Sequence, residues 1–576
     1  MNGIVILLLS IAVLVIAYVT YGSWLAKKWG LDPKRKTPAH EMRDGNDYVP
    51  AKAPVLLGHH FSSIAGAGPI NGPIQAAVFG WVPVLIWIIV GGIFFGAVHD
   101  FGSLFASIRH KGRSIGVVIS DNIGPRAKKL FIVFAYLTLL LVVAAFGSIV
   151  ANTFDGNTGD ARQNTINGTA AMISALFIVL AILFGFFVYR RNTHLGVSTV
   201  IGVIGIVGII IIGLNVQIYL SMNTWLLLIA IYIVIASVTP VWILLQPRDY
   251  LSSFLLYGMM AAAIVGIVAT NPAMNLEPHY GFGGIPGNTL RFLFPMLFIT
   301  VACGSISGFH SLVGSGTTAK QLNNEKDAKV IGYGGMLIEC GLAVISLIAV
   351  GFLMTKGATS MPAGAPTQVF ASGLARMLAT LGGNNQTVYD TAYALLILSV
   401  SAFALTSLDT ATRLARYMFA EFFLDEGETH ESVKGIKKFL TNRWTGTIVT
   451  VGIGMYLAIG GYASVWPLFG AANQLLAGLA LLAVAAWLGN VGRSNKMFII
   501  PMIFMLVATI TSLCLTFTQR LAAVTDGALT TANILQLLFS AILVILAITL
   551  IIEGCQTFVK QARGSKTGVH AHAHKK

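Results

Sequence analysis

Apolar segments of about 20 residues follow one another along most of this 576-residue chain, and they restrict its fold more than any other feature. A helix needs roughly that length to cross a bilayer, where its backbone groups must be hydrogen-bonded internally. The sequence therefore predicts an all-α integral membrane protein with roughly 15 transmembrane helices. The predicted spans are 3–26, 58–80, 81–108, 127–152, 169–189, 195–219, 223–247, 252–270, 290–318, 328–355, 388–420, 445–461, 464–489, 497–519 and 531–556.

Composition excludes a soluble protein, and charge predicts the orientation. Hydrophobic residues make up 56% of the chain and charged residues 10%, whereas about a quarter of a soluble globular chain is charged. The net charge of +15 comes from short basic clusters between spans. This pattern is typical of cytoplasmic loops that face anionic lipid, and it does not indicate nucleic-acid binding. With the N-terminus outside, the strongly basic connectors and the C-terminal tail all fall on the cytoplasmic side.

One span cannot be a continuous helix. Between Gly66 and Pro73 the chain contains three glycines and two prolines, which free backbone groups that a bilayer would leave unpaired. Such breaks in membrane helices often hold a solute, so we expect Gly66 to Asn71 to be non-helical and to line a central site. Close helix packing through the small residues is the alternative. The candidate substrate-binding residues are His59, His60, Ser62, Ser63, Gly66, Gly68, Asn71, Gln75 and Thr239.

Several ionisable residues lie inside predicted spans, and each costs roughly 2.5 to 3.5 kcal/mol at the bilayer centre. His99 and Asp100 begin a polar stripe in span 81–108, and Glu339 has no cation within a helical turn, so its charge must be met from another helix or neutralised. Asp409 is expected to pair with Arg413 one turn later.

Span 290–318 contains a polar run that includes Ser305, Ser307 and His310. The hydroxyls are suited to Na⁺, while the histidine could relay a proton. We expect these three side chains to face span 58–80. The candidate ion-coupling residues are His99, Asp100, Ser305, Ser307, His310, Glu339 and Asp409, with H⁺ or Na⁺ as the coupling ion and no other cofactor.

A second interruption is expected at Pro240 in span 223–247. Two broken spans, five apart and of opposite direction, are typical of an inverted five-helix repeat. The predicted division is a first helix and loop over 1–57, a transporter core over 58–420 with repeats at 58–219 and 223–420, and a connector with C-terminal helices over 421–576. A proline kink that ends at a loop is the alternative for Pro240.

The sequence also resembles a known family. The segments HHFSSIAGAGPINGP, QPRDYL, GFHSLVGSGTTAKQ, LTSLDTATR and FGAANQL are similar to those of the carbon starvation protein A (CstA) family of inner-membrane transporters. The resemblance extends from the first span to about residue 490. It implies a LeuT-like core and ion-driven uptake of small peptides, or of pyruvate in close relatives, during nutrient shortage.

Three other classes fit the sequence less well. A membrane metalloenzyme would use His59, His60, His99, Asp100 and His310, but these residues lack the ligand spacing of a known metal motif, so we predict no enzyme and no metal. A passive channel would not need two broken helices. A nutrient receptor would need a signalling domain, and no soluble segment here has that length. The pattern does not indicate an oligomeric state.

Overall fold

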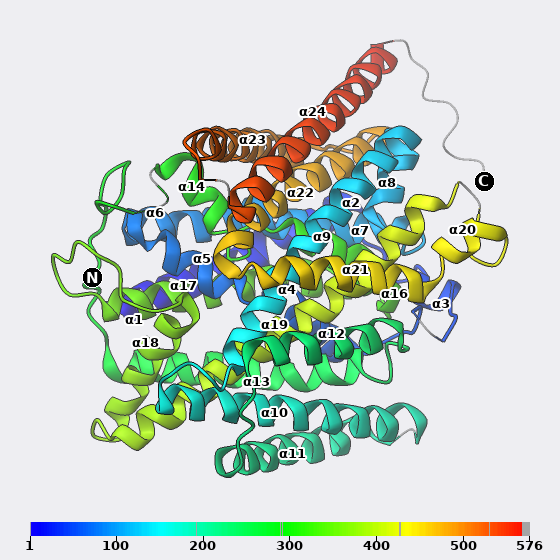
Figure 1. The fold of residues 1–576 in the computed structure, drawn as a ribbon. Coiled ribbons are helices and arrows are strands. Elements are labelled where there is room, and N and C mark those ends of the chain that lie inside the picture. Colours follow the sequence, from blue (N-terminus) through cyan, green and yellow to red (C-terminus); the bar gives the residue numbers. More distant parts are fainter. Residues whose placement is uncertain are drawn as a thin grey trace.

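The computed structural model describes residues 2–566 except 46, 192, 289, 291, 426, 427 and 529. Over these residues the chain is helical, with isolated bridges and no strand (Figure 1). Among them, 11 helices are long and apolar enough to cross a membrane, so a multi-pass protein is confirmed and the predicted count of about fifteen is not. These helices are Gly3–Trp29, Trp81–Arg109, Pro125–Phe154, Ala161–Val188, Leu195–Asn215, Leu245–Thr270, Lys329–Leu353, Gln386–Phe423, Val465–Asn490, Lys496–Thr525 and Thr531–Gln561.

The first half of the chain contains α1 (Gly3–Ala17), η1 (Tyr18–Gly22), α2 (Ser23–Trp29), α3 (Pro38–Glu41), α4 (Ala53–Ala65), α5 (Gly68–Ala76), η2 (Ala77–Phe79), α6 (Trp81–Ile86), η3 (Trp87–Gly96), α7 (Ala97–Arg109), α8 (Ile115–Asn122), α9 (Pro125–Phe154), α10 (Ala161–Gly185), η4 (Phe186–Arg190), α11 (Leu195–Asn215), α12 (Met222–Val238) and α13 (Leu245–Thr270). The second half contains α14 (Leu293–Thr300), α15 (Gly308–Val313), η5 (Gly314–Thr318), α16 (Ala319–Gln321), η6 (Lys329–Gly334), α17 (Gly335–Leu353), α18 (Pro366–Leu381), α19 (Gln386–Phe423), α20 (Gly435–Leu440), α21 (Arg443–Ile459), α22 (Tyr462–Asn490), α23 (Lys496–Thr525) and α24 (Thr531–Lys566).

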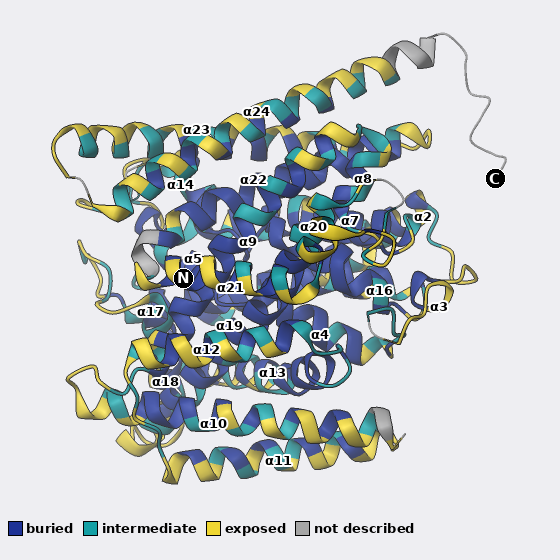
Figure 2. Cartoon of the chain, turned by 45° about the vertical axis from the view of Figure 1, so that its right-hand side comes forward, coloured by how far each residue is buried: buried dark blue, intermediate teal, exposed yellow. Residues whose placement is uncertain are grey.

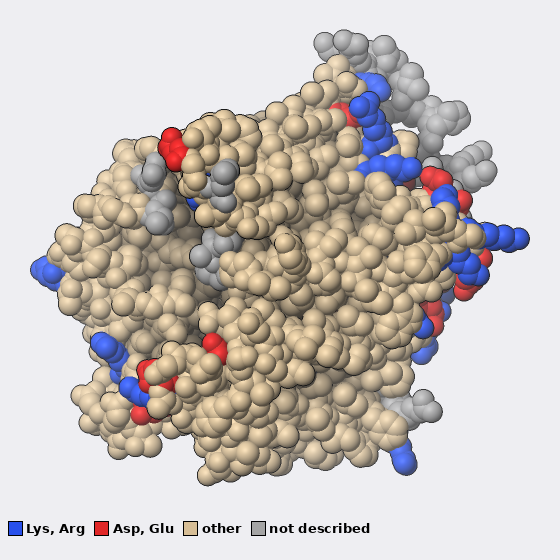
Figure 3. Space-filling view, viewed as in Figure 1, with Lys and Arg blue, Asp and Glu red and all other residues tan. Residues whose placement is uncertain are grey.

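Burial divides the helices into a core and a lipid-facing periphery. The helices α9, α17, α19 and α22 are mostly buried, whereas most residues of α11 and α24 are at least partly exposed (Figure 2). Because apolar side chains on an isolated helix favour hydrocarbon, these exposed faces are suited to lipid. In Figure 3 the Lys and Arg side chains gather at the right-hand end, where Figure 1 shows α3 and α20, and a broad uncharged belt separates them from the other end.

The predicted break in the second span is present but shorter than expected. Helix α4 ends at Ala65, Gly66 has a φ of +38°, and α5 begins at Gly68. A positive φ favours glycine because it has no Cβ. Our expectation that the backbone from Gly68 to Asn71 is non-helical was wrong. Pro69 occupies the first turn of α5, where a proline needs no backbone donor, and the Asn71 N–H donates to the Ala67 carbonyl over 2.9 Å.

The expected break at Pro240 was also wrong. Helix α12 ends at Val238, and Pro240 lies in the turn before α13, where its missing N–H and its restriction of Thr239 end the helix. Arg248, which lies between the predicted spans 223–247 and 252–270, is buried within α13. The second interruption lies instead in span 290–318, where α14 ends at Thr300 and α15 begins at Gly308.

Candidate substrate and ion site

The two interrupted helices meet at their breaks. A Cβ added at Gly68 would overlap Cys303, and one added at Gly72 would lie 2.7 Å from the Thr300 carbonyl oxygen. Each position therefore favours glycine, because the Cys303 side chain approaches Gly68 and the backbone of Thr300 and Val301 approaches Gly72. The region where the helix ends meet thus contains Gly68 of the first break and Cys303 of the second.

Helix α22 forms hydrogen bonds with the residues around the second break. The Asn473 side-chain oxygen accepts a hydrogen bond from the Phe309 N–H over 2.8 Å, and its amide nitrogen donates to the Ser307 hydroxyl over 3.0 Å. The next residue, Gln474, donates to the Phe298 carbonyl over 3.0 Å. These bonds satisfy backbone groups that the interruption frees. Asn473 and Gln474 were not predicted as site residues, although two amides in the middle of an apolar span were an available signal.

A cavity of about 400 Å³ reaches the breaks. Gly68, Gln75 and Cys303 line it, together with residues of α22, of α18 and of the segment just before α18. No described lining residue carries a formal charge. Gln75 accepts a hydrogen bond from the Trp466 indole over 3.1 Å. Asn71 lines a smaller, separate polar cavity between α5, α9, α10 and α18. Of the predicted substrate residues, Gly68 and Gln75 therefore border the larger cavity.

A chain of buried acids and histidines lies beside this cavity. His99 Nδ1 and Asp100 Oδ1 are 2.7 Å apart, Asp100 Oδ2 and His310 Nδ1 are 2.8 Å apart, and His310 Nε2 lies 3.5 Å from Glu339 Oε2. All these side chains have no exposed surface. The structure therefore brings together four of the predicted ion-coupling residues from three helices, and it places His310 of another helix 3.5 Å from Glu339.

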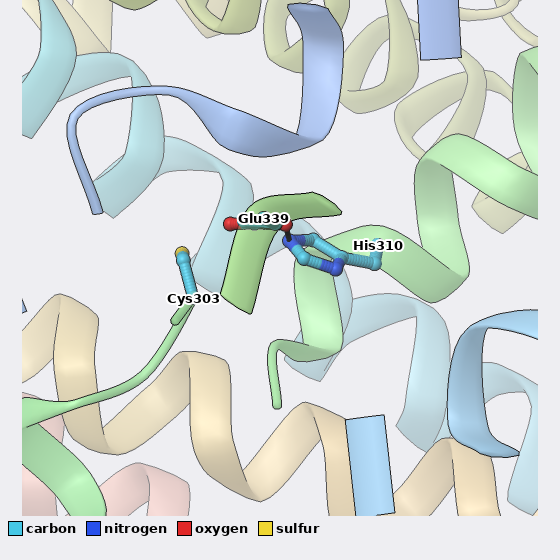
Figure 4. A group of neighbouring side chains, drawn as sticks. All are labelled: Cys303, His310 and Glu339. Atoms are coloured by element: carbon cyan, nitrogen blue, oxygen red, sulfur yellow. Dashed lines mark ion pairs between the residues drawn. The ribbon is translucent and has the colours of Figure 1, made fainter. Parts of the chain in front are cut away.

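Cys303 completes this group (Figure 4). The Cys303 sulfur, a His310 ring nitrogen and a Glu339 oxygen all lie within 4.8 Å of one another. Neither Glu339 oxygen nor His310 Nε2 makes a hydrogen bond to any described residue. We call Asp100, Cys303, His310 and Glu339 the break cluster. Its spacing could hold a proton between His310 and Glu339, or a metal ion among the three donors.

A second buried cluster lies between α4, α12, α13 and α19. His59 Nδ1 lies 2.7 Å from Asp249 Oδ2, and Arg248 donates over 3.0 Å to Asp249 Oδ1 and also bonds Asp409. The Tyr232 hydroxyl donates to Asp409 over 2.7 Å. We call His59, Arg248, Asp249 and Asp409 the ion network. Within it each carboxylate accepts at least one charge-assisted hydrogen bond.

The expected pairing of Asp409 with Arg413 was wrong. Arg413 donates instead to the carbonyls of Ala236 and Thr239, over 2.8 and 2.5 Å. Asp409 is taken by Arg248, which α13 places opposite it across the helix interface. Thr239 follows the last residue of α12, and it is not among the residues that line the cavity at the breaks.

The remaining predicted residues are buried in helix contacts. His60 Nδ1 lies 2.8 Å from the Thr318 hydroxyl, and the Ser62 hydroxyl donates to the Asp249 carbonyl. The Ser63 hydroxyl lies 3.2 Å from that of Thr410. These contacts join α4 to α13, η5 and α19.

The hydroxyls of the second break do not face span 58–80 as expected. Ser305 donates to the Val301 carbonyl over 2.5 Å and packs against Gly91, and Ser307 bonds Asn473. In their place, Val301, Cys303 and Gly304 of the second break approach α5.

The chain is similar to several known proteins. The profile of the family described as carbon starvation protein CstA matches residues 2–366 and 355–512. The chain is 34% identical to the peptide transporter CstA of Campylobacter jejuni, over 88% of this chain and 79% of that one. It is 30% identical to the pyruvate/proton symporter BtsT of Escherichia coli, over 88% of this chain and 80% of that one. A manganese transporter structure from Eremococcus coleocola aligns with a TM-score of 0.49 at 12% identity, over 90% of this chain and 99% of that one. The chain thus belongs to the carbon starvation protein CstA family.

Proposed function

We propose that this protein is a proton-coupled secondary transporter that imports small peptides across the cytoplasmic membrane when carbon is scarce. The observation that carries this proposal is the position of the buried His310 and Glu339 pair beside a cavity where two interrupted helices meet. Discontinuous helices with polar groups at membrane depth are the usual substrate and ion sites of secondary transporters. The names of the relatives, a peptide transporter and a pyruvate/proton symporter, support both the substrate class and the coupling ion.

The cavity favours a peptide over pyruvate. Its volume of about 400 Å³ falls within the range of pockets that enclose drug-sized ligands, which is far more than a three-carbon acid fills. Its described lining residues provide no cation to balance a carboxylate. A zwitterionic peptide carries no net charge and brings both its own termini, so it needs no such counter-ion. Pyruvate is the alternative substrate.

Proton coupling is supported by the hydrogen bonds that the candidate ion-coupling residues make or lack. Glu339 is fully buried and makes no hydrogen bond to a described residue, so its charge is poorly balanced unless a proton is shared with His310. The rival ion, Na⁺, would need the hydroxyl oxygens of Ser305 and Ser307, and the Ser307 oxygen already accepts a hydrogen bond from Asn473. We therefore assign the coupling proton to the His310 and Glu339 pair, with Asp100 and His99 as its continuation.

The helix contacts support an inverted repeat whose boundaries differ from 58–219 and 223–420. The first repeat would consist of α4/α5, α6–α7, α9, α12 and α13, with the α10 and α11 hairpin inserted, and the second of α14/α15, α17, α19, α21 and α22. In this assignment equivalent helices pack on each other: α9 on α19, α12 on α21, and α7 and η3 on η6 and α17. Likewise α4 packs on α13 as α15 packs on α22.

The orientation follows from charge. The end that carries most Lys and Arg side chains is assigned to the cytoplasm, which leaves the N-terminus outside and the C-terminus inside. In this orientation the cavity opens on the external side, where the segment just before α18 helps to line it.

The test is uptake into proteoliposomes that contain the purified protein. Labelled dialanine and labelled pyruvate would be compared under an inward pH gradient and under an inward Na⁺ gradient. The proposal expects concentrative dialanine uptake that needs the pH gradient. Pyruvate uptake without dialanine uptake would replace the substrate, and a requirement for Na⁺ would replace the coupling ion. Bound metal that proves essential for a chemical conversion of the peptide would instead favour an enzyme.

A further inference from the structure

Several potential metal-ligand atoms of the break cluster make no hydrogen bond to a described residue. Both Glu339 oxygens and His310 Nε2 are buried without a hydrogen bond to any described residue, and the Cys303 sulfur is close to them. Buried polar atoms without partners cost about 1 to 3 kcal/mol each, so a group of them pointing at one place requires an explanation. A single shared proton satisfies one oxygen and one nitrogen, and it leaves the second Glu339 oxygen without a partner. The Cys303 thiol donates to the Ser307 hydroxyl over 3.5 Å and lies beside these atoms.

The chemistry of the three donors matches a zinc-like ion. A thiolate, an imidazole and a carboxylate are the ligand types that Zn²⁺ uses, at about 2.3 Å for sulfur and about 2.0 to 2.2 Å for nitrogen and oxygen. Two such ligands in a tetrahedral site lie about 3.4 Å apart by this geometry. The separation of 3.5 Å between His310 Nε2 and Glu339 Oε2 agrees with it. The Cys303 sulfur lies within 4.8 Å of the other donors, so it needs to approach by no more than about 1 Å.

The orientation of His310 is also that of a metal ligand. Its Nδ1 is held by Asp100 over 2.8 Å, and Asp100 is held in turn by His99 over 2.7 Å. A carboxylate on the far nitrogen of a ligating histidine fixes the ring and leaves Nε2 free for the ion. Here Nε2 is the nitrogen that faces Glu339 (Figure 4).

The cluster can also be reached. Cys303 lines the cavity of about 400 Å³, whereas His310 and Glu339 do not, and one Glu339 oxygen lies within 4.8 Å of the Cys303 sulfur. An ion in the cavity would therefore reach the cluster at the thiol. Cys340 provides a contrast, because it is buried next to Glu339 in sequence but packs against Gly92 of the neighbouring helix.

We propose that Cys303, His310 and Glu339 form a binding site for a divalent ion of the Zn²⁺ class, with Asp100 as the residue that positions His310. This site goes beyond the proposed function, because metal binding can be measured on the protein without transport. An ion bound there occupies the place assigned to the coupling proton, so Zn²⁺ in the cavity is expected to stop peptide uptake.

The test uses the purified full chain with His570, His572 and His574 changed to alanine, which removes the histidines of the C-terminal tail as a second metal site. Zn²⁺ bound after dialysis would be measured by elemental analysis, and Co²⁺ would be added to record the sulfur-to-cobalt charge-transfer band. We expect stoichiometric Zn²⁺ and a Co²⁺ band that Cys303→Ser removes and Cys340→Ser leaves unchanged. Asp100→Asn should weaken Zn²⁺ binding by about 10- to 100-fold.

Glu339→Gln provides a second variant in case Cys303→Ser folds poorly, and melting in detergent reports folding of every variant. The site is refuted if no stoichiometric metal binds, or if binding survives both Cys303→Ser and Glu339→Gln, or if Cys340→Ser removes the cobalt band. Peptide uptake that responds to a pH gradient but ignores Zn²⁺ would also contradict the metal site, and it would leave the transport proposal intact.

Discussion

The break cluster and the ion network are both buried groups of acids and histidines, yet their hydrogen bonds differ. In the ion network, Arg248 bonds both Asp249 and Asp409, and His59 bonds Asp249. In the break cluster, Glu339 lies 3.5 Å from His310 and accepts no hydrogen bond from a described residue. The ion network joins helices away from the cavity lining, whereas Cys303 of the break cluster borders the cavity.

This difference separates two uses of buried charge. A network in which each carboxylate has a cationic partner is already balanced and mainly fixes how its helices pack. The charge of a carboxylate that lacks such a partner is balanced only when the carboxylate binds a proton or a metal ion. We therefore expect substitutions in the ion network to affect stability first, and substitutions in the break cluster to affect coupling first.

The largest effect on stability is expected from Arg248→Leu, which leaves two buried carboxylates without their cation. Removing one partner of a buried ion pair costs roughly 3 to 5 kcal/mol, so the apparent melting temperature in detergent should fall sharply. The double variant Arg248→Leu with Asp409→Leu should recover part of the loss, because one of the unpaired charges is removed as well. Equal melting of the wild type and Arg248→Leu would contradict the structural role of the network.

Gly68→Ala tests the contact between the two breaks. The added methyl group would overlap Cys303, so we expect uptake to be lost while the protein still inserts into the membrane. Cys303→Gly in the same chain makes room and should restore part of the uptake. The matched control is Gly452→Ala in α21, where an added Cβ has no neighbour within 4 Å. If Gly68→Ala transports normally, the two breaks are not in contact during transport.

Asn473→Ala tests how α22 holds the second break. The substitution removes the acceptor of the Phe309 N–H and the donor to Ser307, and unpaired buried groups of this kind cost about 1 to 3 kcal/mol. We expect lower uptake together with a modestly lower melting temperature. Asn473→Asp keeps the acceptor and should retain more activity than alanine. A ranking in which alanine exceeds aspartate would show that the acceptor is not what matters.

The smallest effect is expected at Asp47, in the loop before α4. Burial alone would raise the pKa of Asp47, but the charges of Lys320 and Arg413 and a hydrogen bond from Tyr417 hold it below its usual value. A lowered pKa stabilises the fold above the unfolded-state value of about 4, and this contribution is lost as the pH falls further. Asp47→Asn should therefore lower the melting temperature at pH 7, with a difference that shrinks in acid. A difference that grows in acid would reverse the sign.

The sequence predicted the features that depend on local chemistry. The break at Gly66 follows from glycine and proline density, and the importance of Asp100, His310 and Glu339 follows from charge in an apolar span. The second break contains no proline, and it is maintained by Asn473, which lies more than 150 residues later in the chain. No proline marks the position of the second break in the sequence.

The same limit explains the wrong partner for Asp409. Arg413 lies one turn away on the same helix, which is the pairing that helical spacing favours. The actual partner, Arg248, is 161 residues away and reaches Asp409 because α13 packs on α19. At Pro240, the alternative of a helix that ends at a loop was the correct one, because a proline looks the same in sequence whether it kinks a span or closes it.

The most direct test of the central claim is Glu339→Gln in proteoliposomes, with Glu553→Gln on the exposed helix α24 as the control carboxylate. Labelled dialanine would be followed under an inward pH gradient and in exchange with unlabelled dialanine. If His310 and Glu339 carry the coupling proton, Glu339→Gln abolishes concentrative uptake but retains exchange, and Glu553→Gln changes neither. Concentrative uptake that survives Glu339→Gln, needs Na⁺ and ignores the pH gradient would contradict the account.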